Sequence, residues 1–290
     1  MTLGGHKFFP ASAESPTGDG HSADEPWPLV CCRRGMAMKQ DERVPFVDAL
    51  HRARVGAYPP GEFVEQESFM RAGEIRVLAD QAGIVAGASV LDLCCGIAGP
   101  GRFITRSLGC AYLGLDYSPS AIELARQRAG QLPCRFEVAR IPPIPSGPFD
   151  AVLLLETMLA FPEKGPLVQE ISRALASGGR FAFTVEAGLP LTESERVAMP
   201  DADTVWPIPL PEMLGCVERA GLVIRWQEDW SRPHAVMADS LLGAFADDAQ
   251  DIAVQIGRRA LDELLAAHAL WRDWLREGRV CKLALVAEKA

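Results

Sequence analysis

The segment "VLDLCCGIAGPGRF", residues 90–103, places a run of small residues between an apolar strand and a helix. The strand is predicted to end near Asp92 and the helix to begin near Gly99. Such a turn either makes a tight strand-to-helix connection or lets a ligand approach the backbone. In an open parallel sheet, ligands bind at the carboxyl ends of the strands, next to the free N–H groups of a helix start. The small residues that would permit such an approach are Gly96, Ala98, Gly99 and Gly101.

Apolar strands alternate with amphipathic helices on both sides of this turn. Strands are predicted at 89–94, 111–117, 134–140, 149–156, 180–187, 222–230 and 280–289, and helices at 101–109, 118–130, 166–179 and 209–221. In the second of these helices, Ser118 is a suitable N-cap and Pro119 occupies the first turn. Apolar strands separated by helices are typical of a parallel sheet covered on both faces. The predicted fold class is therefore α/β, a doubly wound, Rossmann-like, mostly parallel seven-stranded sheet with a helical lid insertion.

The domain organisation follows from changes in composition along the chain. Residues 1–40 are rich in Gly, Ser, Pro and Asp and have no apolar period, so they are expected to form a disordered leader. Residues 41–75 are expected to form an N-terminal helical cap, and residues 76–290 the main domain. Within that domain, residues 235–277 have helical spacing throughout and precede the last strand. They are expected to form a lid over the sheet edge.

The bulk composition restricts the possible partners. The formal net charge is −9 and the pI is about 5.2, which argues against a nucleic-acid-binding surface. The chain has neither a membrane-length apolar run nor the pattern of a signal peptide. Its eight cysteines are scattered, and adjacent cysteines rarely share a disulfide or a zinc ion. We expect free thiols, no metal, no membrane contact and a cytoplasmic location, and the oligomeric state is left open.

A second acidic position completes a nucleotide-type site. Asp116 ends the second predicted strand, 24 positions after Asp92. An acidic residue about 20 positions beyond a glycine turn suits hydrogen bonding to ribose hydroxyls. A nicotinamide dinucleotide would use the same arrangement, but "CCGIAGPG" does not match G-x-G-x-x-G.

Four segments together resemble the class I S-adenosylmethionine-dependent methyltransferases. They are "VLDLCCGIAGPG", "YLGLDYSPSAIELAR", "FDAVLLLETMLAF" and "RALASGGRFAF", and the resemblance covers roughly residues 60–230. It implies S-adenosyl-L-methionine as cofactor, with Asp116 on the ribose hydroxyls and Tyr117 beside the adenine. It also implies that Asp92, Cys94 and Gly96 line the methionyl end of the cofactor site.

The sequence departs from the family pattern at three positions. Cys94 and Ala98 stand where the family usually has glycine. Arg140 stands where an aspartate commonly accepts a hydrogen bond from the adenine amino group, and a guanidinium has no acceptor to offer. Adenine recognition is then expected to rest on backbone groups or stacking.

The expected reaction is methyl transfer to a small-molecule acceptor, through an amine, hydroxyl or carbon nucleophile, with a natural-product intermediate as one option. The acceptor site is placed between the ends of the fourth and fifth strands and the lid. There Glu156 borders the cofactor and, with His234, is a candidate catalytic residue. Glu186 and His268 are further candidates for lining this cavity. Two alternatives remain open. The chain could bind the cofactor in a non-methylating, cyclase-like or regulatory role, or it could methylate proteins, which would require an open groove.

Overall fold

The computed structural model describes residues 48–290. The leader expected over residues 1–40 and the first part of the cap expected over residues 41–75 therefore lie outside the described residues.

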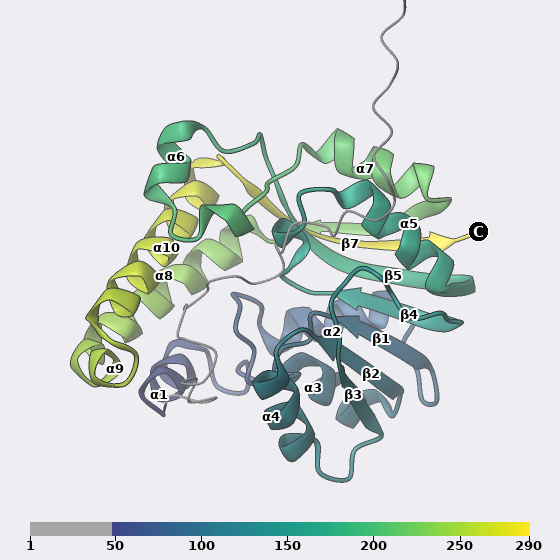
Figure 1. Ribbon diagram of the computed structural model, residues 1–290, viewed down its shortest axis with the longest axis horizontal. Helices are drawn as coiled ribbons and strands as arrows, with labels where there is room; N and C mark the ends of the chain where they lie inside the picture. The colour runs from purple at the N-terminus through teal and green to yellow at the C-terminus, as the bar shows by residue number, and fades with distance from the viewer. Residues whose placement is uncertain (1–47) are drawn as a thin grey trace, which may run out of the picture.

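A seven-stranded sheet forms the centre of the molecule (Figure 1). Its order is β3-β2-β1-β4-β5-β7-β6. The first five strands are parallel, and β7 runs antiparallel to both of its neighbours. The strands are β1 (Ser89–Leu93), β2 (Ala111–Asp116), β3 (Cys134–Val138), β4 (Phe149–Leu154), β5 (Leu175–Ala187), β6 (Leu222–Asp229) and β7 (Cys281–Lys289). The predicted α/β class and mostly parallel seven-stranded sheet are confirmed.

Helices cover both faces of this sheet. Side chains alternate between the two faces along each strand, and apolar residues on both faces need a layer of helices to bury them. Leu91 and Leu93 of β1 pack on the face covered by α5 (Lys164–Ala174) and α7 (Leu210–Arg219). Val90 packs on the other face, under α2 (Ala72–Gln81), α3 (Gly99–Leu108) and α4 (Pro119–Ala129). As expected, Ser118 caps α4, and its hydroxyl accepts a hydrogen bond from the backbone N–H of Ala121.

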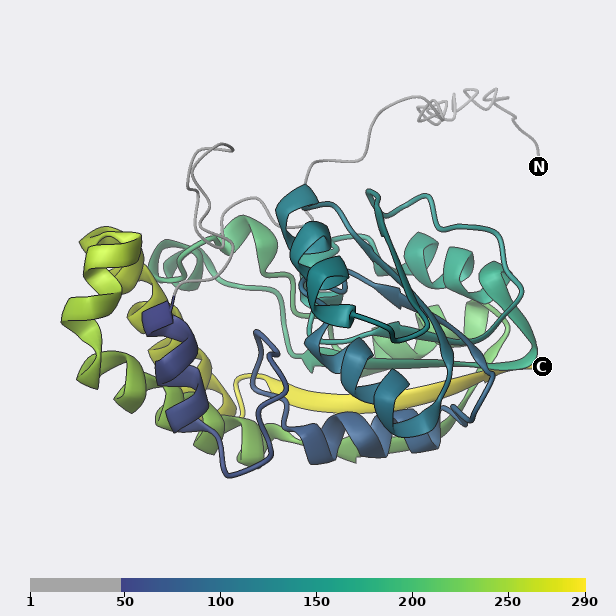
Figure 2. The same ribbon diagram turned by 90° about the horizontal axis from the view of Figure 1, so that it is seen from below.

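A helical layer lies beyond one end of the sheet (Figures 1 and 2). It consists of α8 (Ser231–Asp247), α9 (Ala249–Ile256) and α10 (Arg258–Glu277), inserted between β6 and β7. The N-terminal helix α1 (Asp48–Ala57) packs against them, and Leu50, Phe245 and Leu261 share one buried cluster. The lid predicted at 235–277 therefore begins four residues earlier, at Ser231, and includes α1. The short helix α6 (Glu193–Ala198) lies beside α10 in Figure 1.

The boundary between α5 and β5 differs from the prediction. The sequence favoured a helix as far as residue 179, but α5 ends at Ala174 and β5 starts at once with Leu175. Leu175 pairs with Phe149 of β4, and Gly178 has a positive φ of 72° that a continuing helix would not allow. Tertiary pairing therefore overrides the helical pattern of "RALASGG".

At two positions after β1, the packing leaves no room for a side chain larger than that of glycine. A Cβ built on Gly101 would lie 2.1 Å from Cζ of Tyr112, and one on Gly99 would lie 2.2 Å from the carbonyl oxygen of Val64. Gly96 differs, because its φ is 54° and no heavy atom lies within 4 Å of such a Cβ. The tight-connection interpretation thus fits Gly99 and Gly101, and Gly96 borders open space.

Gly101→Ala is expected to destabilise the fold. The added methyl group must displace the buried Tyr112 ring, and overpacking of this kind costs about 1–3 kcal/mol. Thermal unfolding should show a clearly lower melting temperature. Gly243→Ala is the matched control, because Gly243 lies exposed in α8 with open space around its Cβ position. Alanine there should be neutral or slightly stabilising. Equal melting temperatures for the two variants would contradict the packing role of Gly101.

Candidate active site

A cleft opens at the carboxyl ends of β1, β2 and β4. The chain order reverses between β1 and β4, which is the place where open α/β sheets bind ligands. The cleft measures about 510 Å³, within the usual range for small-molecule sites. Every residue predicted for the cofactor lines it, namely Asp92, Cys94, Gly96, Asp116, Tyr117 and Glu156. The turn after β1 and the loop before α2 form its walls.

Asp116 is held by backbone groups at the end of β2. Its Oδ2 accepts a hydrogen bond from the Gly96 N–H and its Oδ1 accepts one from the Ser118 N–H, each at 2.9 Å. Burial raises the pKa of Asp116, and these backbone hydrogen bonds partly offset the rise. The carboxylate is therefore fixed against the glycine turn, with remaining lone pairs for donors in the cleft.

Asp92 lies deeper, near the end of β1. The Tyr112 hydroxyl donates a hydrogen bond to its Oδ2 at 2.5 Å. Burial raises the pKa of Asp92 to about 7, even though the Tyr112 hydrogen bond acts in the opposite direction. Asp92 is thus a carboxyl group that changes charge near neutral pH.

The two positions that lack the family's glycines both have left-handed backbone conformations. The φ angles are 59° for Cys94 and 56° for Ala98. A side chain in this region costs about 1–2 kcal/mol. The turn thus keeps a glycine-like path with non-glycine residues. Arg140 is exposed and is not among the residues that line the cleft, whereas Tyr117, Ser118 and Ala121 are.

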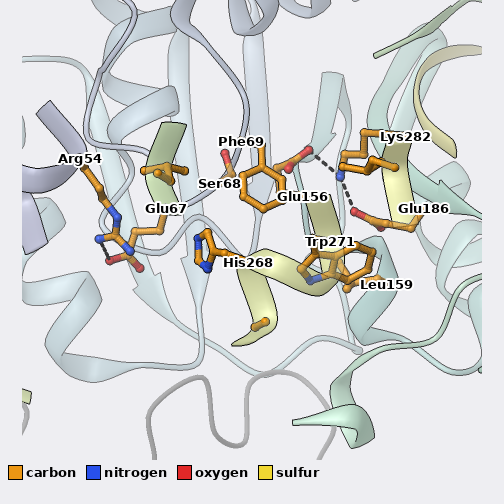
Figure 3. A pocket seen from close by; sticks show the side chains of 13 residues that line it. Arg54, Glu67, Ser68, Phe69, Glu156, Leu159, Glu186, His268, Trp271 and Lys282 are labelled. Atoms are coloured by element: carbon orange, nitrogen blue, oxygen red, sulfur yellow. Dashed lines mark hydrogen bonds and ion pairs between the residues drawn. The ribbon is translucent and has the colours of Figure 1, made fainter. Parts of the chain in front are cut away.

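A second cavity of about 240 Å³ adjoins the cleft beneath the lid (Figure 3). The two cavities share Glu67, Ser68, Glu156 and Leu159. The lid contributes Leu241 from α8 and Ala267, His268, Trp271 and Leu275 from α10. The remaining lining residues are Arg54, Phe69, Glu186 and Lys282. We call this the acceptor cavity.

Glu156 stands where the two cavities meet. It follows β4 with a positive φ of 61°, and its backbone N–H donates to Oγ1 of Thr184 at 2.8 Å. Its Oε1 accepts from the Thr184 hydroxyl at 2.9 Å and lies 2.7 Å from Nζ of Lys282. Burial opposes ionisation of Glu156, but the Lys282 ammonium holds its pKa below the ordinary value. Glu156 is therefore a carboxylate at neutral pH.

Lys282 also binds a second carboxylate. Its ammonium donates to Oε1 of Glu186, at the end of β5, so the three side chains form a buried Glu156–Lys282–Glu186 cluster (Figure 3). Burial works against the charge of Lys282, but the two carboxylates raise its pKa. Lys282 was not among the residues predicted from the sequence. A lysine within the apolar strand "VCKLALVAEK" was the available signal, because a buried ammonium needs a partner.

His234 does not reach the acceptor cavity. It lies in the first turn of α8 with no solvent exposure, and its Nε2 is 3.4 Å from Oε2 of Glu74 in α2. Its ring stacks near Trp230. This placement argues against the predicted contact of His234 with an acceptor. His268 does line the cavity, and its Nδ1 lies 2.8 Å from the Leu264 carbonyl oxygen. Burial lowers the pKa of His268 to about 4.

The loop before α2 lines both cavities through Glu67 and Ser68. Gln66 holds it from inside, since its side-chain nitrogen donates to the carbonyl oxygens of Glu62 (2.9 Å) and Met70 (2.7 Å). Glu65 forms ion pairs with Arg102 of α3 and Arg128 of α4. The segment "EQESF" is therefore part of the site.

The fold and this cleft are those of a Rossmann-like α/β protein with its ligand site at the switch point of the sheet. Residues 90–179 match the family model described as a methyltransferase domain, in agreement with the resemblance to the class I S-adenosylmethionine-dependent methyltransferases. No helix among residues 48–290 is long and apolar enough to cross a membrane.

Individual relatives match parts of the chain. It is 29% identical over 149 residues to the methyltransferase GfsG of Streptomyces halstedii, which is 49% of this chain and 52% of that protein. It is 33% identical over 111 residues to the sterol 24-C-methyltransferase of Eremothecium gossypii, covering 36% of this chain and 30% of that protein. The chain thus spans about half the length of these relatives or less.

A solved structure covers more of the molecule. The cyclopropane synthase MmaA2 of Mycobacterium tuberculosis superposes with a TM-score of 0.71 at 15% identity. The match covers 83% of this chain and 94% of that one. At this identity the likeness establishes the fold.

Proposed function

We propose that the protein transfers a methyl group from S-adenosyl-L-methionine to a small-molecule acceptor. The observation that carries this proposal is the pair of joined cavities. A cleft with Asp92 and Asp116 at the sheet switch point opens at Glu156 into a second cavity that the lid covers. A two-substrate transfer needs two sites that meet at one point, and Glu156 marks that point.

The residues present fit the cofactor. Asp116 would accept hydrogen bonds from the ribose hydroxyls, and Tyr117 would border the adenine. Asp92 and Gly96, with Cys94, would line the methionyl end. When bound, the cofactor supplies a methyl group on a positively charged sulfur. The protein contributes alignment and exclusion of water, which together supply most of the rate in such displacements.

Glu156 would act at the acceptor side. Because it is ionised, fixed by Thr184 and shared by both cavities, it can hold a donor group of the acceptor in line or take its proton. General-base assistance of this kind is worth about 10²–10⁴ in rate. Because the acceptor cavity is covered by the lid, it favours a small-molecule acceptor. A protein segment would require an open groove.

Calorimetry and a turnover assay test the proposal together. The purified chain should bind S-adenosylhomocysteine and not NAD, and it should convert S-adenosylmethionine to S-adenosylhomocysteine when a small-molecule extract is added. Binding without turnover would support a cyclase-like or regulatory role instead. Turnover only with the protein fraction of the extract would favour a protein methyltransferase.

The Asp92 carboxyl predicts a pH dependence of cofactor affinity. With a pKa of about 7, it is ionised above pH 7 and can then pair with the positive charge of the methionyl end. Protonation as the pH falls through 7 removes that attraction. Affinity for S-adenosylmethionine should therefore drop about tenfold from pH 8 to pH 6. Calorimetric titrations at several pH values measure this. Asp92→Asn should flatten the profile, and an unchanged slope in that variant would assign the titration to another group.

The cysteines and the net charge indicate where the protein acts and which partners it has. Five cysteines among the described residues are free thiols, Cys95, Cys110, Cys134, Cys216 and Cys281, which suits a reducing compartment, so we propose a cytoplasmic enzyme. The net charge of −9 disfavours binding to nucleic acids, so we propose that they are not partners of this protein.

A further inference from the structure

We propose that Glu186 anchors a basic nitrogen of the acceptor, so that the acceptor class is a protonated amine. This inference rests on the proposed function, because it assigns the ligand of the acceptor cavity. It concerns the group that Glu186 binds, and the atom that receives the methyl group is a separate question.

The charges that line the acceptor cavity do not balance. Three carboxylates, Glu67, Glu156 and Glu186, face two cations, Arg54 and Lys282. His268 adds no charge at neutral pH, because its pKa lies at about 4. One negative charge is therefore left over. A ligand with one positive charge would neutralise it, whereas an anionic ligand would add to it.

The surplus lies at the buried end of the cavity. At the open end, Arg54 pairs with Glu67 at 3.2 Å, and the Glu67 side chain is 63% exposed. At the buried end, Lys282 is shared by Glu156 and Glu186, whose side chains are 14% and 8% exposed. Lys164 also acts on Glu186 electrostatically, but its ammonium donates to the carbonyl oxygens of Phe161 and Trp206 and is not in contact with the cluster. Lys282 therefore carries the two carboxylates in direct contact, and an incompletely compensated buried charge is costly. The preference for a cation is thus concentrated at this cluster.

One oxygen of the cluster has no hydrogen-bond partner. Oε1 of Glu186 accepts from Lys282, but Oε2 is buried and has no donor among residues 48–290. Buried carboxylate oxygens in folded proteins are normally satisfied, so an unpaired one on a residue that lines a cavity is a position for a donor on a ligand. An ammonium N–H is the strongest such donor, because both members of the hydrogen bond carry charge.

The walls beside the cluster also suit a cation. The rings of Phe69 and Trp271 line the same cavity next to Glu156 and Lys282 (Figure 3). Aromatic faces attract ammonium groups, and more strongly where water is excluded. An apolar skeleton attached to the nitrogen would contact Leu159, Leu241 and Leu275.

A matched pair of probes tests the inference in the full-length protein. Benzylamine, protonated at neutral pH, and benzyl alcohol differ in one group and are small enough to enter the cavity. We expect benzylamine to bind at least tenfold more tightly than benzyl alcohol, measured calorimetrically with and without saturating S-adenosylhomocysteine. In Glu186→Gln, which keeps the shape of the side chain, the preference should fall below threefold. Glu263→Gln, which removes an exposed carboxylate from α10 outside both cavities, should retain it.

The outcomes separate this inference from the proposed function. If S-adenosylhomocysteine binds but the wild-type protein shows no amine preference, or no benzylamine binding, the acceptor assignment is overturned and methyl transfer is not. If S-adenosylhomocysteine fails to bind, the proposed function fails. A preference that persists in a folded Glu186→Gln variant would place the nitrogen elsewhere. If that variant does not fold, the comparison of the two probes on wild-type protein still decides whether the acceptor class is a protonated amine, and Glu186→Asp, which keeps the charge on a shorter side chain, tests the anchor: a preference of unchanged size there would place the nitrogen elsewhere.

Discussion

Asp116→Ala is expected to weaken the binding of S-adenosylhomocysteine by roughly 10- to 150-fold. The carboxylate is a charged acceptor held in place by the N–H groups of Gly96 and Ser118. Loss of hydrogen bonds between a charged acceptor and two ligand hydroxyls costs about 1.5–3 kcal/mol, which corresponds to that range of affinity. Isothermal titration calorimetry measures the change directly.

Two further variants separate ligand contact from damage to the turn. Asp116→Asn keeps an oxygen acceptor for one backbone N–H, but its amide NH2 faces the other N–H, so it should lose part of the affinity and some stability. Asp150→Ala is the matched control, since Asp150 accepts the Ser89 N–H at 2.8 Å and lines neither cavity. It should bind the ligand normally. Unchanged affinity in Asp116→Ala would remove the ribose assignment.

The sheet could be predicted from the sequence because its signals are local. Apolar runs such as "AVLLLE", bounded by loops and helices, indicate buried parallel strands, and Ser118 with Pro119 marks the start of a helix. The end of α5 could not be predicted this way. There, pairing of Leu175 with Phe149 depends on a strand that lies far away in sequence.

Some residues of the candidate site could be placed from the sequence, and others could not. Asp92 and Asp116 come at strand ends, so parallel topology alone brings them to one edge, and both line the cleft. His234 also follows a strand, but it sits on a helix, where the direction of a side chain depends on packing. Its ring faces Trp230 and Glu74 inside the protein. We therefore expect His234→Ala to affect stability more than turnover.

Contacts across the sheet could not be inferred from spacing. Lys282 begins the last strand and reaches Glu156 and Glu186, which follow β4 and end β5. Only the antiparallel return of β7 beside β5 brings these residues together. The sequence shows a charged residue in an apolar strand, and its partners depend on strand order.

Glu156→Gln is expected to lower turnover by about 10²- to 10⁴-fold. The carboxylate is ionised and faces both cavities, so it can hold or deprotonate the acceptor group next to the cofactor. Glutamine keeps the shape of the side chain and its contact with Thr184 but removes both the charge and the basicity. The affinity for S-adenosylhomocysteine should stay within about threefold, a difference of less than 1 kcal/mol. Turnover is measured as S-adenosylhomocysteine formed in the presence of an active acceptor.

A split between turnover and cofactor affinity distinguishes a catalytic carboxylate from a structural one. If Glu156 only neutralises Lys282, its replacement should lower the melting temperature and leave the rate per folded molecule unchanged. If it acts on the acceptor, the rate should fall in protein that remains folded, and the dependence of the rate on pH should change as well. Glu163→Gln, at an exposed position before α5 and outside both cavities, controls for the loss of one negative charge. Full activity in folded Glu156→Gln would remove Glu156 from the catalytic machinery.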